Sequence, residues 1–115
     1  MKREVPTETL RRAVEDSGLD YSTIARRLNW TQPNRARVLR TETPRRMVAE
    51  YGVTAGAVAR CLGWTKPDTG RVRRAIGASS SYTYAGERRP MLSTSYDRAV
   101  EIIRACGLDP VDYDV

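Results

Sequence analysis

The sequence contains no histidine and no phenylalanine, and only two of its 115 residues are cysteine. With only Cys61 and Cys106 available, one chain cannot supply a full Cys/His zinc site, and two thiols do not form a disulfide framework. Without histidine a nucleophile has no ordinary general base, and no Gly-rich phosphate-binding loop is present. We therefore expect a chain that is not an enzyme, holds no metal or cofactor, and keeps its cysteines as small, half-buried thiols.

Long hydrophobic runs are also missing, and no apolar stretch is long enough to span a bilayer. The N-terminal segment MKREVPTET lacks the apolar core of a signal peptide. We expect a cytoplasmic, nucleoid-associated protein without a membrane partner. A length of 115 residues and 40% hydrophobic content allow one small core or two very small packed units.

Lysine is scarce, because the chain has 2 Lys against 18 Arg, with a net charge of +6. A GC-rich genome would give the same ratio, although arginine also suits phosphates and guanine edges. The positions of the charges are more informative. Residues 10–41 hold seven basic and three acidic residues, residues 44–75 hold seven and two, and residues 76–115 hold four and six. Positive charge concentrated in the first two thirds is typical of a nucleic-acid-binding surface.

The chain also contains an internal repeat of 34 residues. Residues 11–41 align without a gap to residues 45–75, with 13 identities in 31 positions. The best-matched stretch pairs LNWTQP, residues 28–33, with LGWTKP, residues 62–67. A helical solenoid can have the same period, but solenoids need about three repeats to close a core. We therefore favour a duplicated helical unit.

Each repeat is expected to form three short helices. Apolar residues at helical spacing predict a first helix that ends at Gly18 or Gly52, where glycine accepts a left-handed conformation. Asp20 or Ser22 caps the second helix of the first repeat, and Thr54 caps that of the second. Asn29 and Gly63 tolerate the positive φ of a tight turn. We expect third helices over 32–40, capped by Thr31, and over 66–76. The link between repeats, 41–43, is too short to be a free tether.

The arrangement of these helices resembles the tri-helical helix-turn-helix of bacterial, phage and archaeal DNA-binding proteins, over residues 7–77. In that family a small residue in the second helix lets the third helix cross closely, as Ala25 and Ala59 would here. A Gly or Asn makes the turn and an apolar residue follows it, here Trp30 and Trp64, which we expect to anchor the core. One departure is Arg35 and Thr69, where the family has a β-branched apolar residue, so the third helix is rotated or packs through Ala36/Val38 and Gly70/Val72.

The resemblance implies that the third helix of each repeat enters a major groove, with the two helices about 10 base pairs apart. Gln and Asn can pair with adenine, and Arg with guanine. The residues expected to contact bases are Gln32, Asn34, Arg35, Arg37, Lys66, Asp68, Thr69 and Arg71. Phosphate contacts orient a protein without specifying sequence. Those expected here are Arg11, Arg12, Thr31, Arg40, Arg45, Arg46, Thr65, Arg74, Arg88 and Arg89.

Residues 78–95 break the helical pattern and form either a short hairpin, resembling the wing of winged-helix proteins, or a flexible Ser-rich linker. Thr94 or Ser95 then caps a helix with Ile102 and Ile103 that we expect to pack instead of binding DNA. The sequence therefore predicts a mainly α protein. Its divisions are 1–41 and 42–77, each a helix-turn-helix unit packed against the other, and 78–115, a hairpin plus a packing helix.

These features favour a transcriptional regulator that binds double-stranded DNA as a monomer or homodimer. The alternative is a recombination, transposition, partition or repeat-array DNA-binding protein. A third interpretation, a protein-binding adaptor, would require acidic or apolar third helices, and these are basic. Both DNA-binding interpretations predict affinity that falls steeply with salt, because binding releases counterions.

Overall fold

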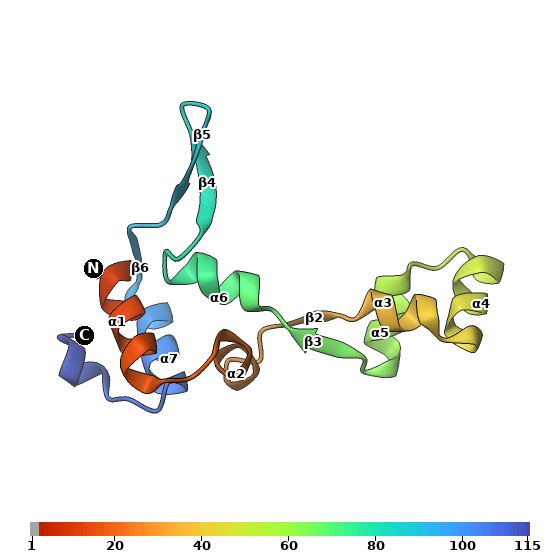
Figure 1. Cartoon of the computed structure of the whole chain (residues 1–115), viewed down its shortest axis with the longest axis horizontal. Coiled ribbons are helices and arrows are strands. Elements are labelled where there is room, and N and C mark those ends of the chain that lie inside the picture. The colour runs from red at the N-terminus through yellow and green to blue at the C-terminus, as the bar shows by residue number, and fades with distance from the viewer. Residues whose placement is uncertain (1–2) are drawn as a thin grey trace. The chain divides into compact units, whose positions relative to one another are not determined.

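The computed structural model describes residues 3–115 and is mainly helical, as expected (Figure 1). The residues divide into two compact units. Unit 1 comprises Met1–Trp30 and Asp68–Val115, and unit 2 comprises Thr31–Pro67. Unit 2 is therefore an insertion within unit 1, and this grouping differs from the division at residues 41 and 77 expected from the repeat.

Unit 1 is built around helices α1 and α7, which lie side by side in Figure 1. Its fully buried residues include Leu10, Ile24, Ile76, Ile102 and Ile103, so the last helix packs as expected. Tyr113 closes the C-terminal end by donating a hydrogen bond of 2.6 Å to Asp16. The elements of unit 1 are β1 (Glu4–Pro6), α1 (Thr7–Ser17), α2 (Tyr21–Arg27), α6 (Thr69–Ala75), β4 (Ser80–Tyr84), β5 (Glu87–Pro90), β6 (Ser93–Ser95), α7 (Tyr96–Ala105) and a 3-10 helix (Pro110–Tyr113).

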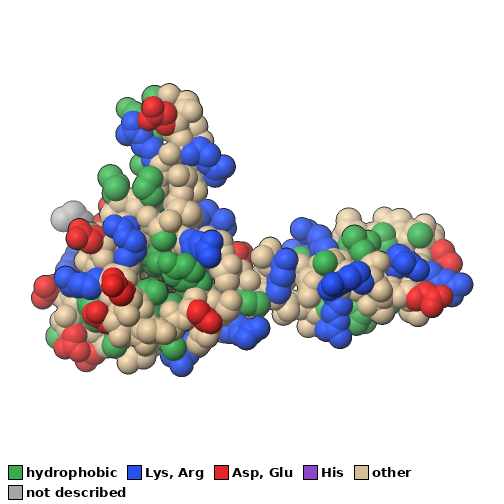
Figure 2. Space-filling model, in the orientation of Figure 1, with side chains coloured by type: hydrophobic (Ala, Val, Ile, Leu, Met, Phe, Trp, Pro, Cys, Tyr) green, Lys and Arg blue, Asp and Glu red, His purple; other side chains and the backbone are tan. Residues whose placement is uncertain are grey.

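Unit 2 has a much smaller core, formed by Val38, Val58 and Ala59 with Trp64 packed against them. Hydrophobic side chains reach its surface, in green in Figure 2, and Tyr51 is 73% exposed. In unit 1 the corresponding surface of α1 and α2 is covered by α7. The elements of unit 2 are β2 (Thr31–Pro33), α3 (Arg35–Arg40), α4 (Glu42–Tyr51), α5 (Ala55–Leu62) and β3 (Thr65–Pro67).

The predicted helix ends and turns are confirmed. Gly18 and Gly52 end α1 and α4 in the left-handed conformation. Asn29 has φ 59° and Gly63 has φ 70°, so both residues adopt the left-handed conformation of the same turn, as their aligned positions predicted. The Asp20 carboxylate caps α2 by accepting from the Thr23 amide at 2.8 Å.

The predicted start of each third helix was wrong. Residues 31–33 and 65–67 form strands β2 and β3, and the caps are Asn34 and Asp68, which accept from the Arg37 and Arg71 amides at 3.2 and 3.0 Å. A residue that precedes proline disfavours helical dihedrals, which holds the positions before Pro33 and Pro67 extended. Neither Thr31 nor Thr65 therefore caps a helix.

The two strands pair antiparallel, so each copy of the repeated segment meets its counterpart. Gln32 lies opposite Lys66, and Thr31 lies opposite Pro67. The ladder continues with hydrogen bonds from the Asp68 amide to the Trp30 carbonyl (2.9 Å) and from the Asn34 amide to Trp64 (2.8 Å). Antiparallel pairing of equivalent segments is the pattern produced by a two-fold symmetric contact, here within one chain.

As a result, the third helices are exchanged between the repeats. Helix α3 of the first repeat packs on α5 of the second, in unit 2, and α6 of the second repeat packs on α2 of the first, in unit 1. Val38 and Val72 are fully buried at these contacts, as are Ala25 and Ala59. The third helices thus pack through their valines, one of the alternatives expected from the sequence, but against the second helix of the other copy.

One difference between the repeats fits this exchange. The Arg35 side chain lies over Gly56, where a Cβ atom would come within 3.1 Å of the Arg35 Nε. The aligned positions in the other copy are Thr69 and Ser22. The exchange therefore combines the long Arg35 side chain with Gly56 in unit 2. In unit 1 it combines the shorter Thr69 side chain with Ser22. Packing each third helix on its own repeat would place Arg35 against a serine.

The segment that follows α6 is a hairpin and not a linker. Strands β4 and β5 pair antiparallel and extend from the end of α6 (Figure 1). The turn residues Ala85 and Gly86 have φ of 52° and 83°, which is the two-residue geometry that matches the strand twist. The pairing register shifts between Ser80 and Tyr82, leaving Ser81 as an extra residue. Among the described residues, no helix is both long and apolar enough to cross a membrane.

Candidate nucleic-acid interface

The same arginine–tryptophan contact occurs in both units. The Arg37 guanidinium lies 4.1 Å from the centre of the Trp64 ring in unit 2, and that of Arg71 lies 4.3 Å from the Trp30 ring in unit 1. All four residues are identities of the repeat. A guanidinium stacked on a ring keeps its N–H groups at its edge, where they can donate to another molecule. The tryptophans therefore anchor the core, as expected, and also fix the direction of one arginine per unit.

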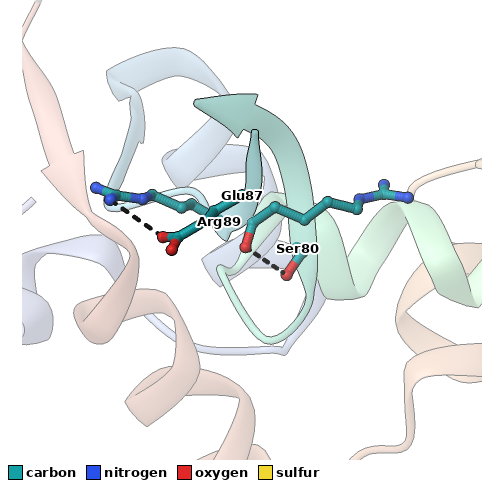
Figure 3. A network of polar contacts seen from close by, with 4 residues as sticks. Ser80, Glu87 and Arg89 are labelled. Atoms are coloured by element: carbon teal, nitrogen blue, oxygen red, sulfur yellow. Dashed lines mark hydrogen bonds and ion pairs between the residues drawn. The ribbon is translucent and has the colours of Figure 1, made fainter. Parts of the chain in front are cut away.

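The third helices are basic and their charges are not neutralised by carboxylates. Helix α3 exposes Arg35, Arg37 and Arg40, and helix α6 exposes Arg71, Arg73 and Arg74. Within residues 3–115 the ion pair that the structure shows joins Arg89 and Glu87, at 3.4 Å on the hairpin (Figure 3). Each unit thus presents one short helix with three exposed guanidinium groups.

The residues expected to contact bases are divided between the units. Unit 1 contains Asp68, Thr69 and Arg71, whereas Lys66 lies in unit 2 with the four candidates of the first repeat. Gln32 and Lys66 are exposed on the strands, opposite each other, and not on helices. The side chains of Asn34 and Asp68 accept backbone hydrogen bonds as caps, so part of their hydrogen-bonding capacity is already used.

The cap contact leads to a prediction for Asp68. Replacement of Asp68 by Ala removes the acceptor for the Arg71 amide and is expected to reduce the free energy of unfolding by about 0.5–2 kcal/mol. Asp68→Asn preserves a capping acceptor and serves as the matched variant in chemical denaturation. If Asp68→Asn loses as much stability as Asp68→Ala, the cap contact does not stabilise α6.

Several residues expected to contact phosphates make contacts within their own unit. Arg11 donates to the Ile76 carbonyl (3.0 Å) and the Gly77 carbonyl (3.2 Å), so it holds the C-terminal end of α6. Arg12 stacks on Tyr113 at 5.4 Å. Arg40 donates to the Ala36 carbonyl of its own helix.

The remaining phosphate candidates lie at the surface. Arg45 and Arg46 are exposed on α4, Arg74 on α6, and Thr31 and Thr65 on the strand pair. Arg88 and Arg89 are exposed on β5. In Figure 3 the Arg89 side chain points toward Glu87, and the Ser80 hydroxyl lies against the backbone carbonyl of Arg88 at 3.5 Å.

Two arginines of unit 1, on α6 and α7, were not among the residues that the sequence predicted to contact DNA. Arg98 lies on α7 with its guanidinium 5.1 Å from the Trp30 ring, and Arg73 lies 5.2 Å from the Tyr21 ring. The sequence gives no signal for Arg98, because its helix has acidic neighbours and an apolar stripe, and both features predict packing. Its half-buried position at the start of that helix could have been inferred only with the tertiary arrangement known.

The ionisable groups with shifted pKa values lie outside the third helices. Hydrogen bonds from Thr23 lower the pKa of Asp20, and the hydrogen bond to Asp16 is the main cause that raises the pKa of Tyr113. Burial raises the pKa of the Cys106 thiol, whereas Cys61 is exposed. Over the described part of the chain, no three acidic or cysteine side chains cluster as metal ligands would.

No protein-family model, curated protein or solved structure matches the chain.

Proposed function

We propose that the chain binds double-stranded DNA sequence-specifically, with α3 and α6 as the recognition helices of two helix-turn-helix units, and acts as a transcriptional regulator. In unit 1 the motif comprises α1, α2 and α6, with the β4–β5 hairpin as a wing. In unit 2 it comprises α4, α5 and α3. The observation that carries the proposal is the recurrence, in both units, of a short arginine-rich third helix with one guanidinium fixed on a tryptophan ring.

The chemistry of these helices fits duplex DNA. A major groove admits one helix, and arginine can form two hydrogen bonds with the O6 and N7 atoms of guanine. The two helices differ at Arg35/Thr69, Ala36/Gly70 and Leu39/Arg73, so the units are expected to recognise different sequences. One chain would then bind an asymmetric site without needing a palindrome.

Selection from a random duplex library tests this proposal, followed by mobility shifts at two salt concentrations. We expect one asymmetric motif and affinity that falls steeply with salt. A perfectly palindromic site would contradict the two-unit arrangement, and the absence of any salt-sensitive shift would contradict DNA binding.

Substitution of the two stacked arginines separates the units. Arg37→Ala and Arg71→Ala are each expected to cost about 1–3 kcal/mol at a guanine in different parts of the selected motif. Arg104→Ala, an exposed arginine on α7, is the control. If both substitutions weaken all sequences equally, the two arginines contact phosphates and do not specify sequence.

A further inference from the structure

Unit 1 contains a basic hollow of about 350 Å³ at the base of the β4–β5 hairpin. Its lining includes Arg71 and Arg74 from α6, Ser81 and Tyr82 from β4, Met91, and Arg98 from α7. Two helices that are distant in the sequence, α6 and α7, thus direct three arginines to one place. No carboxylate lines the hollow, so its positive charge is not neutralised locally.

Trp30 positions two of these arginines. The guanidinium groups of Arg71 and Arg98 lie 4.3 and 5.1 Å from the centre of its ring, and the ring itself is only 6% exposed. Like charges repel, and the buried aromatic ring offsets part of that repulsion. An anion between the guanidinium groups would offset more of it.

Ser81 provides an independent indication of a ligand. It is the extra residue at the register shift of the hairpin, and such bulges commonly redirect a side chain near a functional site. Its Oγ atom is buried and has no hydrogen-bond partner among the residues the structure describes. A buried hydroxyl without a partner is costly, and rotation about χ1 toward the hollow would give it an acceptor when an anion is bound there.

We propose that this hollow binds one phosphate group, with Arg74 and Arg98 donating to its oxygens and the Ser81 hydroxyl donating a further hydrogen bond. Arg71, whose donors are assigned above to guanine, contributes positive charge to the hollow. Guanidinium groups bind phosphate through paired, charge-assisted hydrogen bonds. The phosphate can come from the DNA backbone or from a free phosphorylated molecule. Only the first source rests on the DNA-binding function proposed above.

The repeat supplies an internal comparison. Unit 2 has the counterparts Arg37 and Arg40 of two of the arginines, but its sequence segment includes neither the hairpin nor α7. We therefore expect one phosphate site per chain, in unit 1.

Titration of the full chain with inorganic phosphate, followed by NMR, tests the site without DNA. We expect saturable shifts at the Ser81 amide and at the Arg74 and Arg98 side-chain Nε–H groups. Arg98→Gln is expected to weaken phosphate binding roughly tenfold or more, because it removes a charged donor. Arg104→Gln, on the same helix but outside the hollow, should leave the binding unchanged. Shifts that are absent, or unchanged in Arg98→Gln, would overturn the proposal.

Ser81→Ala tests the site without disturbing the packing around Trp30, because both Arg71 and Arg98 stay stacked on the Trp30 ring. It is expected to weaken phosphate binding several-fold, as loss of one hydrogen bond to a charged group would, with an unchanged melting temperature. If Arg98→Gln and Ser81→Ala both retain wild-type phosphate affinity while folded, the hollow is not the site.

Duplex binding distinguishes the two sources. If a backbone phosphate occupies the hollow, Arg98→Gln weakens all DNA sequences alike and reduces the slope of log K against log salt by about 0.9. If the slope is unchanged while free phosphate binding is lost, the site belongs to a small phosphorylated ligand. Phosphate binding by a chain that binds no DNA would support the site and refute the proposed DNA-binding function.

Discussion

Deletion of residues 31–64 is expected to leave a folded protein that contains every element of unit 1. This deletion removes one repeat period and joins Trp30 to Thr65. The Asp68 amide already donates to the Trp30 carbonyl at 2.9 Å, so residues 65–67 need only form a short turn between them. Helix α6 would keep its contact with α2, and the unit 1 core would be unchanged.

The matched variant is the first repeat alone, residues 1–41, which we expect to be unfolded. Its third helix packs on α5, and its first two helices pack on α6 and α7, all of which it lacks. Circular dichroism and the dispersion of amide NMR signals would compare the two variants. A folded 1–41 fragment together with an unfolded deletion variant would show that each third helix packs on its own repeat.

Replacement of Trp30 by Ala is expected to destabilise unit 1 by about 3–5 kcal/mol, the usual range for a buried tryptophan. The ring is 6% exposed and belongs to the main core cluster. Since a domain of this size has a total stability of roughly 5–15 kcal/mol, the variant should be close to unfolding. The same substitution at Trp64, which is only partly buried, should cost less. Urea denaturation with separate probes in each unit would measure both.

Trp30→Phe separates packing from the cation–π contacts. It keeps an aromatic face for Arg71 and Arg98 while removing part of the side-chain volume, so it should retain much of the stability that Trp30→Ala loses. Equal losses for Trp30→Ala and Trp64→Ala would contradict the difference in core size between the units.

Local features of the fold could be predicted from the sequence because their causes are local. Gly18 and Gly52 stop helices through their own backbone freedom, and Asn29 and Gly63 turn the chain for the same reason. The sequence predicts the starts of α3 and α6 three residues early, because a proline is typical of the first turn of a helix. Proline suits that position, but the strand pairing of β2 with β3 decided otherwise.

The exchange of third helices could not be predicted in this way. The buried residues of the packed helices, Ala25 and Val72 in unit 1 and Ala59 and Val38 in unit 2, have the same identity in both copies. Either pairing therefore satisfies the hydrophobic pattern equally. The difference lies in Arg35 over Gly56, and its significance is visible only once the two residues are known to touch.

The candidate site was predicted in part. Five of the six exposed arginines of α3 and α6 were among the residues expected at the surface, and Arg73 was not. Helical spacing separates these side chains from the buried valines. Arg11 was assigned to phosphate because arginine pairs recur in the repeat, whereas its hydrogen-bond partners, Ile76 and Gly77, are far along the chain. Contacts of that separation leave no signal in a single sequence.

Because unit 1 is assembled from two segments of the chain, its integrity depends on the peptide bonds of unit 2. A protease that cuts once within residues 31–67 would leave unit 1 as two separate fragments held together by noncovalent contacts alone. Folding of unit 1 would then depend on concentration, as it does for a dimer. Unit 2, with its small core and exposed apolar side chains, is the part expected to open most readily to such a cut. The rate at which unit 1 is degraded in a cell is therefore expected to depend on the stability of unit 2.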